Sequence, residues 1–206
     1  MQYTHLHNVP TPPDDMESIQ EYSTSVPGCT FHVSKGTVVE FEGDTIVNAA
    51  NVGGLGGGGV DGAITTAGGT ELAHCRKQLI ELEPGIRIYT GDAKVTLSGN
   101  DSYDYVVHAV GPNYNNYEDE KEADLLLSLA YENSMKEAKA IGSVSIAFSL
   151  ISAGVFRGTK SIDHVLYIGM EAIKNNLYEG LEEVHMVGFS DKEVAALIKI
   201  AKLLKF

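Results

Sequence analysis

The chain has 206 residues, 43% of them hydrophobic and 21% charged, which is typical of one globular domain with a large core. Its net charge of −13 argues against broad binding to nucleic acids or acidic membrane surfaces. No apolar run reaches membrane-spanning length, and the N-terminus lacks a signal-peptide pattern. We therefore expect a monomer in the cytoplasm or the nucleus.

Residues 1–28 hold most of the prolines and show no sustained apolar period. We interpret them as an N-terminal tail that is poorly ordered or wraps over the protein, with a single domain at residues 29–206. His5 and His7 in this tail have no nearby partner pair, so we expect them to be solvated rather than metal-bound. The cysteines Cys29 and Cys75 give no disulfide framework, and Cys75 is predicted to lie in the core.

Residues 30–42 are predicted to form one or two strands, and the apolar run from Thr45 to Ala50 a buried strand. Four consecutive glycines follow, and Asp61 comes where a helix is ready to begin. Strand, glycine loop and helix start are the usual parts of a phosphate-binding loop, because glycines let the backbone approach an anion and the helix N-terminus carries partial positive charge. A flexible linker is the alternative, but linkers seldom lie between a buried strand and a helix.

The helix after Asp61 is expected to continue through Leu82, because apolar residues recur at helical spacing and Pro84 and Gly85 then stop it. His108 lies within an apolar strand, so we expect a buried, hydrogen-bonded histidine rather than a catalytic base. The other predicted elements are strands at 105–110, 145–151 and 184–189, and helices ending near 140, at 162–177 and at 191–204, the last opened by a capping box at Ser190. This alternation predicts an α/β fold whose ligand loops lie at the carboxyl ends of the strands.

The run Asn48-Ala-Ala-Asn51, followed by Leu-Gly-Gly-Gly-Gly-Val-Asp-Gly-Ala-Ile at residues 55–64, resembles the signature of macrodomains, which bind ADP-ribose. It is most similar to the MacroD-type branch, which contains enzymes that remove ADP-ribose from acidic side chains. Residues 107–112 and 152–156 resemble further family motifs, so the likeness runs from about Gly36 to Phe189. The resemblance implies a three-layer α/β/α sandwich with a mixed sheet of about six strands.

The resemblance also implies a site for ADP-ribose. Asn51 and Asp61, ten positions apart as in hydrolytic members, are the implied catalytic residues: Asn51 would hold ribose hydroxyls and water, and Asp61 would orient or activate the water. A helix N-cap is the alternative role for Asp61, and Asn48 would tie the loop together or touch ribose. The implied ligand-binding residues are Thr37, Val38, Asn48, Gly57, Gly58, Gly59, Val60, Ser152, Ala153, Gly154, Val155, Phe156 and Phe189.

Two positions depart from the family pattern. Macrodomains usually carry an aspartate that holds the adenine amino group where this chain has Thr37, whose hydroxyl can still accept a neutral hydrogen bond. Arg157 stands where a small residue is usual, and it would either add a cation near the phosphates or point outward. The implied roles of Phe156 and Phe189, over the distal ribose and against adenine, compete with plain core packing.

The leading hypothesis is an ADP-ribosyl hydrolase acting on mono-ADP-ribosylated acidic side chains of proteins, and also on O-acetyl-ADP-ribose. A non-catalytic ADP-ribose reader is the alternative. The glycines at 54, 56 and 59 match the dinucleotide-binding spacing, so an NAD-dependent redox enzyme is a third hypothesis, although a glycine run matches that spacing easily. Histidines and carboxylates lack the close spacing of metal ligands, so no metal and no cofactor are expected.

Overall fold

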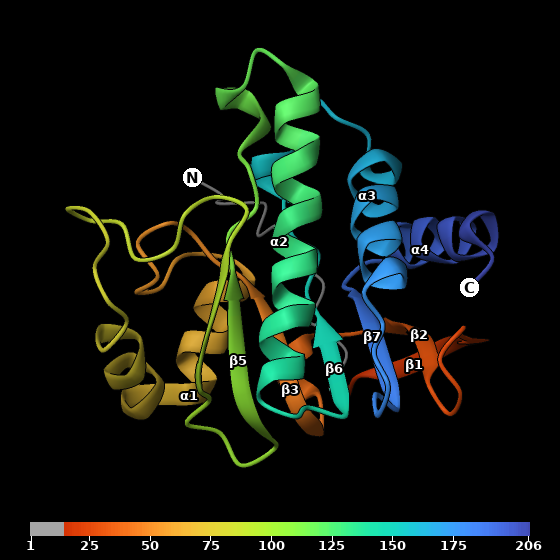
Figure 1. Ribbon diagram of the computed structural model, residues 1–206, viewed down its shortest axis with the longest axis horizontal. Helices are drawn as coiled ribbons and strands as arrows, with labels where there is room; N and C mark the ends of the chain where they lie inside the picture. The colour runs from red at the N-terminus through yellow and green to blue at the C-terminus, as the bar shows by residue number, and fades with distance from the viewer. Residues whose placement is uncertain (1–14) are drawn as a thin grey trace, which may run out of the picture.

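A computed structural model describes residues 15–206 (Figure 1). Its centre is a seven-stranded sheet with the order β1-β2-β7-β6-β3-β5-β4. The five inner strands run parallel, and the edge strands β1 and β4 run antiparallel to their neighbours. The strands are β1 (Glu17–Ser23), β2 (Thr30–Lys35), β3 (Gly43–Ala49), β4 (Ala93–Leu97), β5 (Tyr103–Ala109), β6 (Ser145–Phe148) and β7 (Glu183–Gly188).

Helices cover both faces of the sheet, which confirms the predicted three-layer α/β/α sandwich. Helices α2, α3 and α4 pack on one face over the larger core, whereas α1 and the short 3-10 helix η1 (Val38–Glu40) pack on the other. None of the helices among residues 15–206 is both long and apolar enough to cross a membrane. The α-helices are α1 (Val60–Lys77), α2 (Glu120–Ala140), α3 (Ile162–Asn175) and α4 (Asp191–Leu204).

The structure corrects the prediction that residues 1–28 form an N-terminal tail. Residues 17–23, assigned to the tail, pair with β2 and form the strand that brings the sheet to seven rather than about six. Nearly all side chains of β1 are exposed, so the strand has no apolar alternation that the sequence could reveal, and only its backbone pairing defines it. His5 and His7 lie outside the described residues.

Helix α1 is shorter than predicted and is kinked. It ends at Lys77 rather than near Leu82, and Gly69 interrupts it with φ of 55°. The buried residue that follows Leu72 is Arg76, four positions later, while Cys75, predicted to be core, is only half-buried. Spacings of three and four residues both suit a helix face, and the apolar residue was the wrong choice between them.

The topology brings two loops together. Strand β3 lies beside β6, and both strands end at the same edge of the sheet. The glycine loop after β3 therefore lies next to the loop after β6, and the ends of β2 and β7 continue the same edge. A cleft at this edge is what the rule for open parallel sheets predicts.

Candidate functional site

Two adjoining cavities, of about 470 Å³ and 500 Å³, lie at the carboxyl ends of the strands. They share residues of both loops and together form one elongated cleft. The first cavity is bounded by the ends of β2 and β7, and the second by the two loops after β3 and β6. The shared lining residues are Gly59, Val60, Leu150 and Gly154.

The first loop delivers the open N-terminus of α1 to the cleft. Gly59 is the N-cap residue, has φ of 60° and makes no side-chain capping bond. The first N–H groups of a helix have no partner within the helix, so these donors are available to an anion. Asp61 lies in the first turn rather than at the cap, and its alternative role as N-cap is therefore wrong.

The second loop has a strained residue at its centre. Ser152 has φ of 54°, a conformation that costs energy for a residue other than glycine and that often marks a functional site. Its hydroxyl donates a hydrogen bond of 2.8 Å to the carbonyl of Pro112, which holds the loop in place. Gly154 then caps the 3-10 helix η3 (Val155–Arg157) without a side-chain bond, so this loop also presents backbone N–H groups.

Arg157 supports the second loop from within. Its Nε donates to the carbonyl of Ala153 at 3.0 Å, and a terminal guanidinium nitrogen donates to the carbonyl of Lys160 at 2.7 Å. The side chain therefore neither points outward nor lines either cavity. Arg157 therefore stabilises the backbone of the second loop through these two hydrogen bonds.

Asp61 is almost completely buried, with 2% exposure, and its two oxygens have different surroundings. Oδ1 accepts hydrogen bonds from Asn48 Nδ2 at 2.8 Å and from a terminal nitrogen of Arg76 at 2.7 Å. Oδ2 has no hydrogen-bond partner among residues 15–206. It lies 3.0 Å from where a Cβ on Gly57 would be, so it is directed toward the glycine loop.

Arg76 is a residue of the site that sequence reasoning missed. It is fully buried, and besides Asp61 it contacts the carbonyl of Gly54 at 2.7 Å and the hydroxyl of Thr65 at 2.9 Å. One side chain at the end of α1 thus connects the glycine loop with the start of the helix. A buried cation requires such pairing, but its partners lie 11 to 22 positions earlier in the chain, beyond the kink at Gly69.

Beneath Asp61, Asn48 and His108 form a buried chain of hydrogen bonds. Asn48 Nδ2 also donates to His108 Nδ1 at 3.1 Å, so Nε2 carries the proton and donates to Thr96 Oγ1 at 2.9 Å. Burial, and then the charge of Arg76, lower the pKa of His108 to about 3. The prediction of a structural histidine is confirmed. Asn48 is fully buried and lines neither cavity, and its hydrogen bonds join Asp61 to His108.

Asn51 lines the second cavity, and its amide shapes the glycine loop. Nδ2 donates to the carbonyl of Gly56, and Oδ1 accepts from the backbone N–H of Gly53, each at 3.0 Å. Nδ2 also lies 3.1 Å from where a Cβ on Gly57 would be. Asn51 Nδ2 and Asp61 Oδ2 therefore converge on the same point, which only a residue without a side chain leaves open.

The far end of the cleft combines an aromatic ring with a carboxylate. Phe189 is 47% exposed and lines the first cavity with Thr37 and Glu193. The Thr37 hydroxyl accepts from the backbone N–H of Val39 at 3.4 Å. Glu193 Oε2 accepts from the backbone N–H groups of Phe189 and Ser190, whereas Oε1 has no hydrogen bond within the described range. Sequence reasoning assigned Glu193 only to the capping box, which the structure confirms.

A family model for the Macro domain matches residues 47–162. The chain belongs to the macrodomain family. It is 37% identical over 171 residues to "O-acetyl-ADP-ribose deacetylase 1" of Pantoea vagans, covering 82% of this chain and 96% of the relative. It is 45% identical over 126 residues to an "O-acetyl-ADP-ribose deacetylase" of Escherichia fergusonii, covering 61% of this chain and 68% of the relative. The structure resembles the Oceanobacillus iheyensis macrodomain with ADP, with a TM-score of 0.81 and 28% identity over 92% of this chain and 97% of that one.

The cleft of this macrodomain brings together every predicted site residue except Asn48. Thr37, Val38, Ala153 and Phe189 line the first cavity. The second cavity is lined by Asn51, Gly57, Gly58, Asp61, Ser152, Val155 and Phe156, and residues Gly59, Val60 and Gly154 line both.

Proposed function

We propose that this macrodomain is a hydrolase that removes mono-ADP-ribose from acidic side chains of proteins and deacetylates O-acetyl-ADP-ribose. The observation that carries the proposal is the convergence of Asn51 Nδ2 and the unpartnered Asp61 Oδ2 beside Gly57. The names of the relatives from Pantoea and Escherichia support an esterase-type activity on O-acetyl-ADP-ribose.

Solved variants of the Oceanobacillus macrodomain add a second line of support. They replace an asparagine, an aspartate ten positions later, and the glycine three positions before that aspartate, the last with ADPR bound. Asn51, Asp61 and Gly58 have the same spacing in this chain. The three positions are therefore candidates for the same site, with Asn51 and Asp61 in the catalytic roles.

The shape of the cleft suits a long dinucleotide ligand. The pyrophosphate would lie between the two loops, where backbone N–H groups at Gly59 and Gly154 are free of side-chain caps. Such donors bind phosphate without a lysine or an arginine, so the net charge of −13 is no obstacle to an anionic ligand. The distal ribose would then face Asn51, Asp61 and Phe156, and adenine would occupy the first cavity.

The chemistry requires one water and no redox partner. For O-acetyl-ADP-ribose, water adds to the acyl carbon, the bond from that carbon to the ribose oxygen breaks, and acetate and ADP-ribose are released. For a glutamate or aspartate ester, hydrolysis releases ADP-ribose and the free carboxylate. Asp61 Oδ2 would accept a hydrogen bond from the water and orient it, while Asn51 would hold a ribose hydroxyl.

Glu193 gives adenine a carboxylate at the opposite end. Macrodomains usually hold the adenine amino group with an aspartate, and this chain has Thr37 there. Glu193 Oε1 lies in the same cavity without a hydrogen-bond partner among residues 15–206. We assign to it the acceptor role for the adenine amino group, with Phe189 against the ring.

One experiment tests the proposal: release of ADP-ribose from a glutamate-linked mono-ADP-ribosylated protein, with calorimetric binding of ADP-ribose measured on the same sample. We expect both binding and release in the wild type. Asp61→Asn keeps the size and the hydrogen-bonding atoms near Arg76, and we expect it to bind ADP-ribose but release it at least 100-fold more slowly. Binding without release in the wild type would indicate a reader, and absence of both would overturn the proposal.

A further inference from the structure

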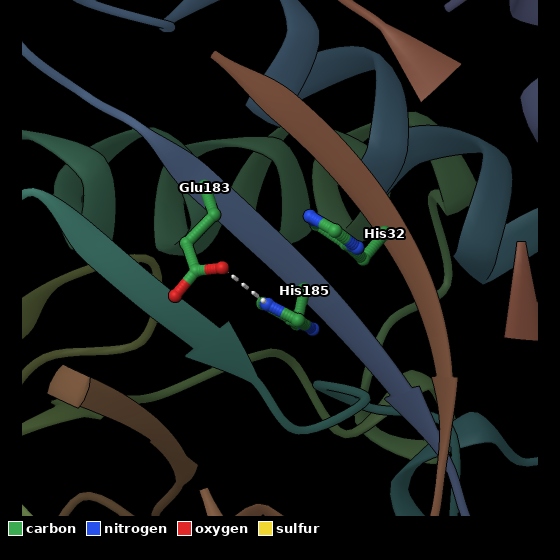
Figure 2. Close-up of side chains that lie close together, drawn as sticks. All are labelled: His32, Glu183 and His185. Carbon is green, nitrogen blue, oxygen red and sulfur yellow. Dashed lines mark ion pairs between the residues drawn. The ribbon is translucent and has the colours of Figure 1, made fainter. Parts of the chain in front are cut away.

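A second cluster of polar side chains lies outside the cleft, on the face of the sheet that α1 and η1 cover. His32 on β2 and His185 on β7 are paired in the parallel register. Their rings are stacked with centroids 4.2 Å apart and an angle of 6° between the planes. Glu183 precedes His185 by two residues on β7, and its Oε2 lies 3.3 Å from His185 Nε2 (Figure 2).

Serine hydroxyls occupy one nitrogen of each ring. Ser34 Oγ is 2.9 Å from His185 Nδ1, and Ser18 Oγ is 3.0 Å from His32 Nδ1. The Nε2 atoms remain, and Figure 2 shows both on the side of the rings where the Glu183 carboxylate lies. Contacts of this kind fix the orientation and the tautomer of histidines that bind metals through the other nitrogen.

His185 Nε2 is a buried polar atom without a hydrogen bond. The residue is 7% exposed, and the atom has no hydrogen-bond partner within residues 15–206. Buried polar atoms are nearly always bonded, but Glu183 Oε2, 3.3 Å away, does not complete a hydrogen bond to this one, so the atom remains open to another partner.

We propose that His32, His185 and Glu183 form a binding site for a divalent transition-metal ion, with Zn²⁺ as the best fit. One ligand atom from each residue lies within 4.8 Å of the others. Two imidazole nitrogens and one carboxylate oxygen are a donor set that zinc prefers, and water completes the tetrahedron.

Small side-chain movements complete the site. Zinc binds nitrogen and oxygen at about 2.0–2.2 Å, so the three ligand atoms must move closer together. The parallel rings also direct their lone pairs side by side, so one ring must rotate about χ2, a torsion with a broad energy minimum, and its serine hydroxyl must turn with it to keep the Nδ1 hydrogen bond. The Glu183 side chain is 37% exposed and is free to follow the ion.

The bound ion would link two strands that carry the adenine end of the cleft. Strand β2 leads into Thr37, and β7 leads into Phe189. Val187, two residues after His185, already lines the first cavity. The ion would therefore have a structural role next to the cleft and take no part in hydrolysis, and the proposal departs from the expectation, drawn from the sequence, that the chain holds no metal.

The test is a calorimetric titration of the chelator-treated full chain with Zn²⁺ alone, together with thermal unfolding in the presence and absence of the ion. We expect one equivalent to bind with a micromolar or lower Kd and to raise Tm. Replacement by Co²⁺ should give the absorption spectrum of a tetrahedral site. A wild-type chain that binds no stoichiometric Zn²⁺ would overturn the proposal.

Conservative variants assign the ligands. His32→Gln, His185→Gln and Glu183→Gln should each weaken binding at least tenfold. Glu182→Gln removes the same charge from the adjacent exposed position and should leave binding unchanged. Circular dichroism and ADP-ribose binding verify that each variant is folded, and binding of Zn²⁺ that survives in all three ligand variants contradicts the assignment.

Two further variants exclude other sites. Glu120, Asp124 and His164 form another cluster of potential ligands, and His5 and His7 lie in the N-terminal segment. Glu120→Gln and the double variant His5→Gln/His7→Gln should bind Zn²⁺ as the wild type does. Loss of binding in either one would place the ion elsewhere and overturn the proposal.

Discussion

Two buried histidine clusters lie on the same face of the sheet and differ in how completely the ring nitrogens of their histidines are hydrogen-bonded. In the cluster under the cleft, both ring nitrogens of His108 are hydrogen-bonded, and Arg76 neutralises Asp61. In the cluster between β2 and β7, His185 Nε2 has no hydrogen bond among the described residues. A histidine whose two ring nitrogens are both hydrogen-bonded, such as His108, holds its neighbours Asn48 and Thr96 in place, whereas a histidine with an unpartnered ring nitrogen, such as His185, can bind a ligand itself.

The largest expected effect comes from breaking the ion pair in the cluster under the cleft. Arg76→Met leaves the Asp61 carboxylate buried without a counter-charge, which should lower the free energy of unfolding by about 3–5 kcal/mol. Urea unfolding measures this change. The double variant Asp61→Leu/Arg76→Met should regain most of the stability and none of the activity. If the single variant were as stable as the wild type, the ion pair would not hold the site together.

Next in size is an effect on catalysis through Gly57. A Cβ at this position would lie 3.0 Å from Asp61 Oδ2 and 3.1 Å from Asn51 Nδ2. Gly57→Ala should therefore lower kcat/KM by about 10- to 100-fold, because sub-ångström displacement of reacting groups is costly. Gly58→Ala, whose Cβ meets no described protein atom within 4 Å, is the comparison variant; because Gly58 lines the same cavity, ADP-ribose affinity is measured for both variants and kcat at saturating substrate separates a loss of binding from displacement of Oδ2. If both variants had the same kcat, displacement of Asp61 Oδ2 would have no effect on catalysis, which would contradict its assigned role.

The pH dependence of the free energy of unfolding tests whether His108, in the cluster under the cleft, is held in its neutral form. The folded state holds the pKa of His108 at about 3, whereas an unfolded histidine titrates near 6.5. The unfolded chain then binds the additional proton as the pH falls from about 6.5 toward 3, so stability should fall by up to about 1.4 kcal/mol per pH unit.

His108→Gln should reduce this slope by about one proton, as measured by urea unfolding at several pH values between 4 and 7. His74→Gln, at an exposed position on α1, is the control and should retain the wild-type slope. An unchanged slope in His108→Gln would show that His108 is not held neutral by its cluster.

The smallest effect is expected at Glu193. Like Asp61, this residue has one carboxylate oxygen with hydrogen bonds and one without, among the described residues. Glu193→Gln keeps a capping-box residue but removes the charge. Affinity for ADP-ribose should fall about tenfold, which corresponds to about 1.4 kcal/mol. Calorimetry measures it, and an equal loss for ribose 5-phosphate, which has no adenine, would contradict the assigned contact.

The parts of the fold that depend on local sequence could be predicted. Helix α4 begins after the capping box of Ser190 and Glu193, which lies within four residues, and its bounds agree with the prediction. The glycine loop after β3 was predicted because a run of glycines between a buried strand and a helix is typical of an anion-binding loop and unusual for a linker. Strand β1 was missed because its side chains are exposed, and pairing with β2 is a non-local property.

The residues of the candidate site divide in the same way, into those predicted from local sequence and those missed because their partners are distant in the chain. The backbone loops and the residues Asn51 and Asp61 were predicted from a contiguous motif, and the structure places them along one cleft. Arg76 was not predicted, because a charged residue is not expected on the buried face of a helix and no motif connects it to Asp61. His32 and His185 are separated by most of the chain, and only the parallel pairing of β2 with β7 makes them neighbours.

The ion pair between Asp61 and Arg76 has a consequence for how related sequences diverge. Replacing either residue alone leaves a buried charge uncompensated, so each single step passes through a less stable intermediate. Positions 61 and 76 are thus expected to be inherited as a unit, changing together or staying fixed. A relative that has lost the aspartate should also have lost the arginine, and such a pair of changes would mark a lineage that has abandoned catalysis while keeping the fold.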